Sequence, residues 1–379
     1  MKIIADENMP LVQELFGGFG EVITAPGRGI SPALVADADI LLVRSVTKVD
    51  SRLLAGSRVK FVGTATIGTD HLDLSWLAAQ SITWASAPGC NAAAVADYVI
   101  AALSAVEPDW VQQTIAIVGC GNAGGGVYRR LTALGVNVLC FDPFLDVASG
   151  LPLVTFDEAL DADILCLHTP LTRDGPHPSW HLFDTHALSR LKPGAVLLNA
   201  GRGEVVDNGA LLEAISDRGL RAVLDVWEGE PHINTRLLDR VALGTPHIAG
   251  YSLEGRLRGS LMIHEALRHW LGEGEPVTLT ALLAQLIGAA AAPQALACSV
   301  SSTLPELVLA AYDPRRDDQA LRQALADAAP ELAGATFDSL RKHYPWRREF
   351  SHFALADALP AELGRQLQAA GFTTGAVPC

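Results

Sequence analysis

The chain has few cysteines, and none of them stands in a paired or metal-binding pattern. Three of the six lie in or beside apolar runs that predict buried strands, where cysteine behaves as a small hydrophobic residue. A disulfide-stabilised protein is therefore not expected, and a reduced, cytoplasmic protein is. The six are Cys90, Cys120, Cys140, Cys166, Cys298 and Cys379.

Positive charge and long hydrophobic runs are also scarce. Lysine and arginine number 28 against 42 aspartates and glutamates, and the resulting net charge of −14 argues against nucleic acid or an anionic membrane as a partner. The most apolar run, residues 281–292, is interrupted by Gln285 and Gly288 and is too short to span a bilayer. Because Met1 leads directly into a strand-like segment, we expect no signal peptide.

What the chain does have is a high apolar fraction, 49%, and a length of 379 residues that allows two or three domains. Up to about residue 90, short apolar runs alternate with helical segments, which predicts a parallel α/β sheet. Residues 43–45 place a cation and a hydroxyl at the end of one expected strand, and the small residues of 63–70 leave backbone amides open to an anion at the end of another; the alternative for each is a capped loop. The expected strands are Ile3–Ala5, Glu21–Thr24, Ile40–Val43, Phe61–Gly63 and Ile82–Trp84.

The most informative motif begins with Ile115–Val118, an apolar run that predicts a buried strand. Glycines follow it at the G-x-G-x-x-G spacing of a dinucleotide-binding turn, then a helical pattern and a second strand that ends on Asp142. A carboxylate there would bind a ribose and repel a 2′-phosphate. The alternative is a glycine-rich turn without a ligand, but the frame of strand, helix, strand and acid favours NAD. The glycines are Gly119, Gly121 and Gly124.

Three later segments hold candidates for catalysis. Arg202 follows an apolar strand, and its guanidinium suits a carboxylate with a neighbouring carbonyl. Residues 224–231 offer three carboxylates, and His247 lies in a turn rich in proline and glycine. Oxidising a hydroxy acid releases a hydroxyl proton, which histidine accepts near neutral pH, and a carboxylate on its other nitrogen fixes the tautomer. Further strands are expected at Ile164–Leu167, Ala195–Asn199, Ala222–Val226 and Val241–Leu243.

The C-terminal part of the chain carries no dinucleotide signal but keeps an apolar periodicity, which predicts a small third domain. Before it, Ser252 is expected to cap a long amphipathic helix that packs on the first domain. The basic cluster 341–348 is either a solvated or subunit-contact face or a phosphate or partner-active-site contact. His177 and His181 are four residues apart, but Pro178 disrupts the helix that would place both on one metal-binding face. We expect no metal site there or elsewhere in the chain.

Together these residues resemble the D-isomer-specific 2-hydroxyacid dehydrogenases over about residues 1–272. Beside the glycine motif, the matching segments are Pro-Gly-Cys-Asn at 88–91, Leu-His-Thr-Pro-Leu-Thr at 167–172, Asn-Ala-Gly-Arg-Gly at 199–203, Leu-Asp-Val-Trp-Glu-Gly-Glu-Pro at 224–231 and Thr-Pro-His-Ile-Ala-Gly at 245–250. Within that family, residues 43–48, residues 63–71, Tyr251 and the extra C-terminal domain resemble the members that oxidise 4-phospho-D-erythronate at C2 and dimerise through that domain.

The resemblance implies roles for individual residues. Arg202 would orient the substrate carboxylate and polarise the C2 oxygen, His247 would be the general base, and Glu230 would pair with it. The implied NAD site comprises Gly119, Gly121, Asn122, Ala123, Gly124, Asp142, Thr169, Ala200, Gly201, Asp225 and Gly250. The implied substrate contacts are Arg44, Ser45, Thr66 and Tyr251. The candidate cations for a substrate phosphate are Arg44, Lys48, Arg347 and Arg348.

The expected fold class is α/β: two Rossmann-like or flavodoxin-like parallel-sheet domains with an active-site cleft between them, plus a small α+β C-terminal dimerisation domain. The expected boundaries are 1–92 with 251–285 for the substrate-binding lid, 93–250 for the NAD-binding domain and 286–379 for the C-terminal domain. The expected partners are a small phosphorylated 2-hydroxy acid and a second copy of the chain. Two alternatives stay open: another dehydrogenase of phosphorylated 2-hydroxy acids, such as a phosphoglycerate dehydrogenase, and an NAD-sensing regulator.

Overall fold

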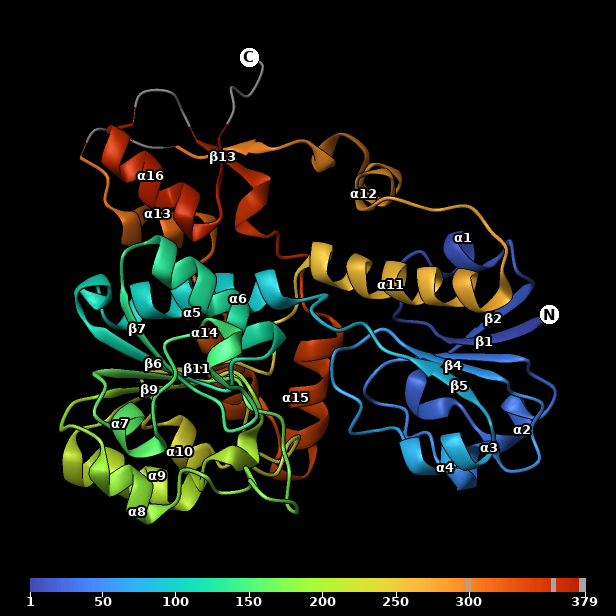
Figure 1. The fold of residues 1–379 in the computed structure, drawn as a ribbon, viewed down its shortest axis with the longest axis horizontal. Helices are drawn as coiled ribbons and strands as arrows, with labels where there is room; N and C mark the ends of the chain where they lie inside the picture. The colour runs from blue at the N-terminus through green and yellow to red at the C-terminus, as the bar shows by residue number, and fades with distance from the viewer. Residues whose placement is uncertain (298, 300, 356–358, 375–379) are drawn as a thin grey trace. The chain divides into compact units, whose positions relative to one another are not determined.

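The structure, a computed structural model, describes residues 1–297, 299, 301–355 and 359–374 (Figure 1). Cys298 and Cys379 lie outside the described residues. The chain divides into two compact units: Met1–Asn91 with Ser252–Ala292 form unit 1, and Ala92–Tyr251 with Pro293–Cys379 form unit 2. Within the described ranges, no helix combines the length and the apolar character that crossing a membrane requires.

Unit 1 is built on a five-stranded parallel sheet in the order β2-β1-β3-β4-β5. All residues of the neighbouring strands β3 and β4 are buried, as uninterrupted apolar runs predict for strands covered on both faces. The ends of each strand lie within one residue of those predicted from the sequence. The strands are β1 (Lys2–Asp6), β2 (Glu21–Ala25), β3 (Ile40–Val43), β4 (Phe61–Thr64) and β5 (Thr83–Ala85).

Helices cover both faces of this sheet, because successive strand residues point to opposite sides. Ile3 lies in one core and Ile4 in the other. The first core includes residues of α1 (Val12–Phe16), α11 (Leu253–Leu271) and α12 (Leu279–Ile287), and the second includes residues of α2 (Pro32–Val35), α3 (Ser51–Leu54) and α4 (Leu74–Ala79). As expected, Ser252 caps α11: its hydroxyl accepts a hydrogen bond from the Gly255 amide at 2.8 Å.

Unit 2 contains a six-stranded parallel sheet in the order β11-β10-β9-β8-β6-β7. The last strand starts later than the expected Val241–Leu243, because the Val241 amide still donates to the Leu237 carbonyl at the end of α10 (Thr235–Leu238). The strands are β6 (Thr114–Val118), β7 (Asn137–Phe141), β8 (Ile164–Leu167), β9 (Val196–Asn199), β10 (Arg221–Leu224) and β11 (Leu243–Gly244).

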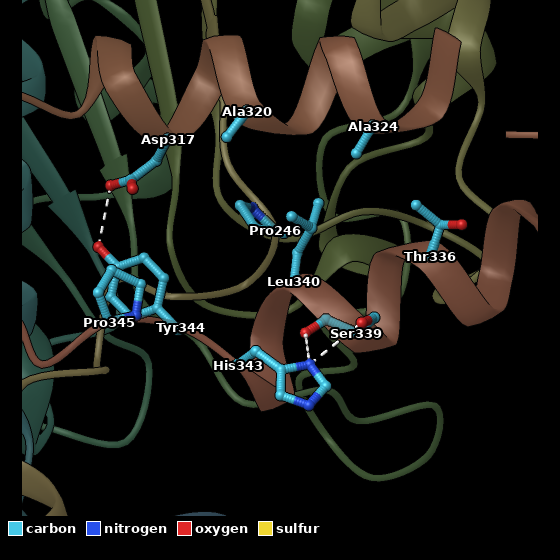
Figure 2. Close-up of a pocket in the computed structure, with 10 residues that line it drawn as sticks. All are labelled: Pro246, Asp317, Ala320, Ala324, Thr336, Ser339, Leu340, His343, Tyr344 and Pro345. Carbon is cyan, nitrogen blue, oxygen red and sulfur yellow. Dashed lines mark hydrogen bonds between the residues drawn. The ribbon is translucent and has the colours of Figure 1, made fainter. Parts of the chain in front are cut away.

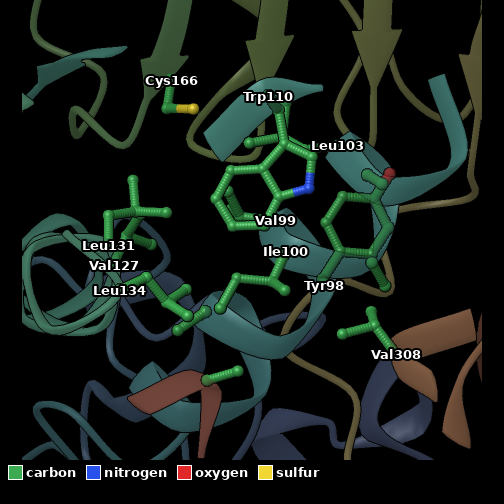
Figure 3. Packing of buried hydrophobic residues seen from close by; sticks show 14 of the residues in the cluster. Tyr98, Val99, Ile100, Leu103, Trp110, Val127, Leu131, Leu134, Cys166 and Val308 are labelled. Carbon is green, nitrogen blue, oxygen red and sulfur yellow. The ribbon is translucent and has the colours of Figure 1, made fainter. Parts of the chain in front are cut away.

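The C-terminal residues share the two cores that cover this sheet. On one face, Tyr98, Trp110 and Val308 lie in the same apolar cluster (Figure 3). On the other face, Leu321 and Phe337 join the cluster that buries β8. The helices of the first face are α5 (Ala92–Val106), α6 (Asn122–Ala133), α13 (Leu304–Ala311) and α16 (Ala361–Ala370); those of the second are α7 (Phe156–Leu160), α8 (Thr185–Arg190), α9 (Asn208–Arg218), α10, α14 (Arg315–Asp327) and α15 (Ala333–Lys342).

The C-terminal segment also has a small sheet of its own. It is three-stranded and parallel, in the order β12-β13-β14. The strands are β12 (Gln294–Ala295), β13 (Phe353–Leu355) and β14 (Thr373–Thr374). The segment therefore combines α and β structure, while its helices are anchored in the same unit as the six-stranded sheet.

Candidate active site

The three glycines that follow β6 meet different structural requirements. Gly119 has φ +88°, a left-handed conformation that favours glycine. A Cβ on Gly124 would lie 2.0 Å from the Gly119 carbonyl oxygen, so α6 approaches the strand as closely as only glycine permits. A Cβ on Gly121 would meet no atom within 4 Å, and α6 begins there without a side-chain cap. The start of α6 therefore offers uncapped amides to a phosphate group.

Asp142 and Thr169 border this glycine loop. The Asp142 carboxylate accepts hydrogen bonds from the amides of Cys120 (2.9 Å) and Phe144 (3.1 Å). Thr169 is 9% exposed, and its hydroxyl has no hydrogen-bond partner within the described chain. The ring nitrogens of His168 are also buried without such a partner, and burial lowers the pKa of His168 to about 4. Unsatisfied polar atoms beside uncapped amides fit a bound dinucleotide.

The candidate residues of unit 2 come together because the parallel strands end at one edge of the sheet. The strand register aligns Gly244, Leu224, Asn199, Leu167, Val118 and Phe141 in one row. His247 lies three positions beyond this row on β11, and Arg202 three positions beyond it on β9. Only β10 separates these strands, so their ends are roughly 10 Å apart at about 4.8 Å per strand. The glycine loop and Asp142 follow the last two strands of the same edge.

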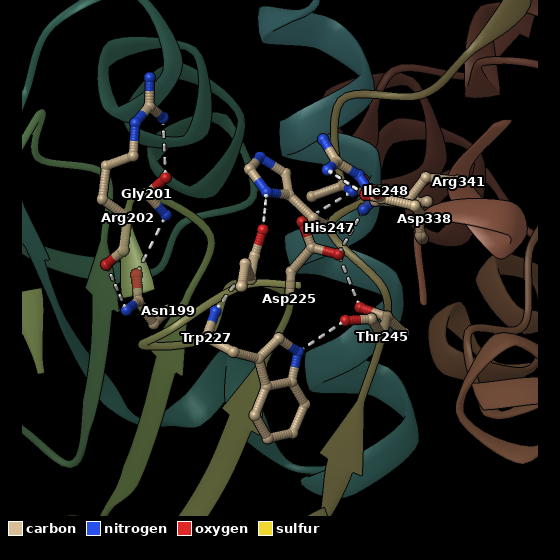
Figure 4. A network of polar contacts seen from close by, with 12 residues as sticks. Asn199, Gly201, Arg202, Asp225, Trp227, Thr245, His247, Ile248, Asp338 and Arg341 are labelled. Atoms are coloured by element: carbon tan, nitrogen blue, oxygen red, sulfur yellow. Dashed lines mark hydrogen bonds and ion pairs between the residues drawn. The ribbon is translucent and has the colours of Figure 1, made fainter. Parts of the chain in front are cut away.

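His247, labelled in Figure 4, forms a hydrogen-bonded pair with Glu230 at this edge. His247 Nδ1 lies 2.8 Å from Glu230 Oε2, and Glu230 Oε1 accepts from the Trp227 amide at 2.8 Å. Burial acts to raise the pKa of Glu230, but the charge and hydrogen bond of His247, with the charge of Arg341, hold that pKa below its usual value. An ionised Glu230 accepts the Nδ1 proton, which leaves Nε2 to accept a proton from a ligand.

Asp225 holds the loop that carries His247. It is 1% exposed, and its carboxylate accepts from the Thr245 hydroxyl (2.7 Å) and from the amides of Ile248 (2.7 Å) and Ala249 (2.9 Å). Complete burial raises the pKa of Asp225, and these bonds oppose that shift. His247 has φ +57°, which is uncommon for a residue with a side chain. Both carboxylate oxygens of Asp225 are thus engaged within the loop.

Arg202 is carried by a turn that Asn199 organises. The Asn199 side chain accepts from the Gly201 amide (3.1 Å) and donates to the Arg202 carbonyl (2.9 Å), and Arg202 Nη1 donates to the Gly201 carbonyl (2.9 Å). A Cβ on Gly201 would lie 2.9 Å from the Thr169 carbonyl oxygen. The turn therefore packs against the residues after β8, beside the glycine loop.

The substrate-contact candidates of unit 1 follow two neighbouring strands. Arg44 and Ser45 come directly after β3, and Thr66 lies two residues after β4. The Thr66 hydroxyl lies 2.8 Å from the Thr64 hydroxyl, which in turn lies 2.9 Å from His71 Nε2. Because β3 and β4 are paired, these residues share one edge of the unit 1 sheet. Unit 1 thus presents hydroxyl groups and a cation at its strand ends.

Sequence reasoning missed Arg341 as an individual site residue. It extends from α15, where Nη2 lies 3.4 Å from the Tyr251 hydroxyl and the guanidinium carbon lies 5.9 Å from the Tyr251 ring centre. Its charge also contributes to the lowered pKa of Glu230. The basic cluster 341–348 was the only signal for it, and composition alone did not separate Arg341 from its neighbours.

A cavity of about 420 Å³ lies between α14 and α15 (Figure 2). Ala320, Ala324 and Leu340 line its apolar wall, and Pro246, the residue before His247, also faces it. None of the residues expected to bind NAD or substrate lines this cavity. In the part of the chain that the structure describes, no three His, Cys, Asp or Glu side chains gather as metal ligands would.

Comparison with known families matches both parts of unit 2. The family model for the NAD-binding domain of D-isomer-specific 2-hydroxyacid dehydrogenases matches residues 97–249. A second model, described as a domain of unknown function (DUF3410), matches residues 293–371. The first match contains the whole strand-end edge from the glycine loop to His247.

Individual proteins show the same likeness. The erythronate-4-phosphate dehydrogenase of Saccharophagus degradans is 50% identical over 380 residues, which cover 98% of this chain and 99% of that protein. Among solved structures, the TT0316 protein of Thermus thermophilus has a TM-score of 0.63 at 26% identity and covers 73% of this chain and 98% of its own. The NAD-dependent formate dehydrogenase of Staphylococcus aureus in complex with NAD has a TM-score of 0.59 at 25% identity, with 73% and 97% covered.

Proposed function

This chain belongs to the D-isomer-specific 2-hydroxyacid dehydrogenase family, and on that premise we propose that it oxidises 4-phospho-D-erythronate at C2 with NAD. The product is 2-oxo-3-hydroxy-4-phosphobutanoate, an intermediate in the synthesis of pyridoxal 5′-phosphate. The near full-length likeness to an erythronate-4-phosphate dehydrogenase supports this substrate. The paired His247 and Glu230, on the same sheet edge as the glycine loop, support the chemistry.

The cofactor is NAD, and the residues beside the glycine loop fit it. We assign the pyrophosphate to the loop and the start of α6, because a Cβ on Gly121 would meet no protein atom and no side chain caps the helix. Asp142 is assigned to a ribose, and the hydroxyl of Thr169, which has no hydrogen-bond partner among the described residues, to the cofactor as well. When bound, NAD supplies the ring that accepts the hydride from C2.

The residues of the chain then perform the proton chemistry. Nε2 of His247 takes the proton of the C2 hydroxyl as the carbonyl forms, and Glu230 stabilises the resulting imidazolium through Nδ1. Arg202 binds the substrate carboxylate and polarises the C2 oxygen, which its planar fork of donors permits. Asp225, which the resemblance implies for the NAD site, is proposed here as a positioning residue as well, because its carboxylate is occupied in fixing the loop that carries His247.

Arg44, Ser45 and Thr66 of unit 1, with Tyr251 of unit 2, are proposed to contact the substrate. The Thr66 hydroxyl is fixed by its contact with Thr64 and by its donation to the Gly68 carbonyl at 3.0 Å, so its remaining lone pair can accept a hydrogen bond from a ligand. Hydroxyl groups and a cation are the groups that an acidic, hydroxylated substrate requires.

We further propose that the enzyme is a cytoplasmic homodimer held together by its C-terminal segment. Leu332 and Trp346 of that segment are 55% and 53% exposed, although both are large and apolar. Burial between two subunits would remove these side chains from water. Sedimentation equilibrium of the full chain is expected to give twice the monomer mass, and a monomer at micromolar concentration would contradict the assembly.

The observation that carries the proposal is the His247–Glu230 pair on the edge that also holds the glycine loop. The test is to follow NADH formation with 4-phospho-D-erythronate, 3-phospho-D-glycerate and D-lactate at equal concentrations. We expect the highest kcat/KM with 4-phospho-D-erythronate. A preference for 3-phospho-D-glycerate would reassign the substrate within the family, and no NADH from any 2-hydroxy acid would favour an NAD-binding regulator.

A further inference from the structure

Arg341 is a partly buried cation that neighbouring residues satisfy only in part. Its side chain is 16% exposed. Nη2 lies 3.4 Å from the Tyr251 hydroxyl and Nη1 lies 3.9 Å from the Asp338 carboxylate. Both separations exceed the range of about 2.7–3.2 Å that N–H···O hydrogen bonds prefer. Nε is buried without a hydrogen-bond partner in the described part of the chain.

The charge of Arg341 is balanced by the charges of Glu230 and Asp338 rather than by a short hydrogen bond to a carboxylate. The charges of Glu230 and Arg341 stabilise each other, but both Glu230 oxygens already accept hydrogen bonds from His247 and Trp227. A guanidinium carries five donors in a rigid fork, and removing it from water is costly unless an anion pairs with it. Arg341 is therefore arranged for an anion that comes from outside the chain.

The other cations of the C-terminal segment have different surroundings. Arg347 is 8% exposed and lies over the ring of Tyr312; its Nη2 donates to the carbonyls of Ala94 (3.1 Å) and Ala249 (2.5 Å), while Nε and Nη1 have no hydrogen-bond partner among the described residues. These contacts join three parts of unit 2 and make Arg347 a structural residue. Arg348 lies 3.2 Å from His352 Nε2, in the segment after α15. Arg341 is the member of the cluster that faces Tyr251 and Glu230.

We propose that Arg341 binds the phosphate group of the substrate, so that the C-terminal segment supplies a residue of the active site. The inference rests on the proposed function, which requires a substrate with two anionic groups. Arg202 is assigned to the carboxylate, and in Figure 4 His247 lies between Arg202 and Arg341. Two guanidinium groups on opposite sides of the base would hold the two ends of the substrate, and a phosphate matches the fork of Arg341 in a bidentate manner.

The test compares a phosphorylated with an unphosphorylated substrate in the variants Arg341→Met and Arg341→Lys. With 4-phospho-D-erythronate, we expect kcat/KM to fall by about 10- to 100-fold in Arg341→Met, the range of a lost hydrogen bond to a charged group, and by less in Arg341→Lys. With D-erythronate, kcat/KM should not change. The matched control is Arg365→Met, which removes an equally charged but exposed residue of α16 that pairs with Glu362. Equal losses with both substrates, or no loss, would overturn the proposal.

A second measurement is independent of turnover. Inorganic phosphate is expected to raise the thermal midpoint of the wild-type chain and of Arg365→Met, but not that of Arg341→Met. If phosphate still raises the thermal midpoint of Arg341→Met, or does not raise that of the wild type, the phosphate subsite is rejected. Failure of the wild type to oxidise any phosphorylated acid would instead reject the proposed function, while the phosphate shift would still decide on Arg341.

Discussion

The two parallel sheets end in edges of different chemical character. In unit 1, the helices that follow β3 and β4 are capped by their own side chains: Asp50 accepts from two amides of α3, and Asp73 from one of α4. In unit 2, α6 begins at Gly121 with no side-chain cap. Where a side chain caps a helix, its first amides are already occupied, whereas the uncapped start of α6 leaves backbone amides for a phosphate. We therefore assign NAD and the proton chemistry to unit 2, and to unit 1 only the substrate contacts of Arg44, Ser45 and Thr66.

The largest effect should come from His247, the proposed base of the unit 2 edge. In His247→Ala, we expect kcat to fall by about 10²- to 10⁴-fold, the usual contribution of general acid–base catalysis, with the Kd of NAD unchanged. Stopped-flow turnover and isothermal titration calorimetry with NAD measure the two quantities. Loss of NAD binding together with turnover would mean that His247 supports the fold of the edge rather than the proton transfer.

Gly121 tests whether the uncapped helix start is the cofactor site. A Cβ there would meet no protein atom, so Gly121→Ala should leave the thermal midpoint unchanged. The added methyl group should nevertheless weaken NAD by about 5- to 100-fold, because the backbone must approach the pyrophosphate closely. Gly364→Ala in α16 is the matched control, since a Cβ there also meets open space. Unaltered NAD affinity in Gly121→Ala would mean that the glycine loop does not contact the cofactor.

The Asp142→Asn variant tests whether this edge binds NAD in preference to NADP. Asp142→Asn keeps an oxygen that can accept from the Cys120 amide but removes the charge. We expect about tenfold weaker NAD binding and stronger NADP binding, because the carboxylate no longer receives a ribose hydroxyl or repels a 2′-phosphate. The ratio of kcat/KM values for the two cofactors is the readout, and a constant ratio would refute the ribose contact.

The smallest effect is expected for Thr66 of unit 1, which would contribute a single hydroxyl group. Thr66→Val removes one hydroxyl and should raise the KM for 4-phospho-D-erythronate by about 2- to 10-fold without changing the Kd of NAD. Ser301→Ala, in the C-terminal segment, is a matched control that removes an exposed hydroxyl. An equal effect on NAD would contradict the division of tasks between the two edges.

Local sequence signals predicted much of this fold and of the candidate site. Uninterrupted apolar runs located β3, β4 and β8, and the glycine spacing located the start of α6. These features depend on residues that are neighbours in the chain, so they can be predicted from a single sequence. The pairing of His247 with Glu230 followed from the resemblance, and the structure contains the hydrogen bond.

Contacts between distant segments were not predictable in the same way. Nothing in the apolar periodicity indicated that Leu321 and Phe337 would complete the core of the six-stranded sheet. Arg341 and Arg347 belong to one basic cluster, yet one faces Tyr251 and the other is buried against Tyr312. Their roles depend on where α15 packs, which tertiary contacts decide and local charge does not.

The most direct test of the account follows the hydrogen on C2. The wild-type chain is incubated with 4-phospho-D-erythronate deuterated at C2 and with NAD, and the NADH is analysed by mass spectrometry. We predict one deuterium in each NADH formed by the wild type, and a rate of formation reduced by about 10²- to 10⁴-fold in His247→Ala. Unlabelled NADH, or no NADH at all, would contradict hydride transfer from C2 at this edge.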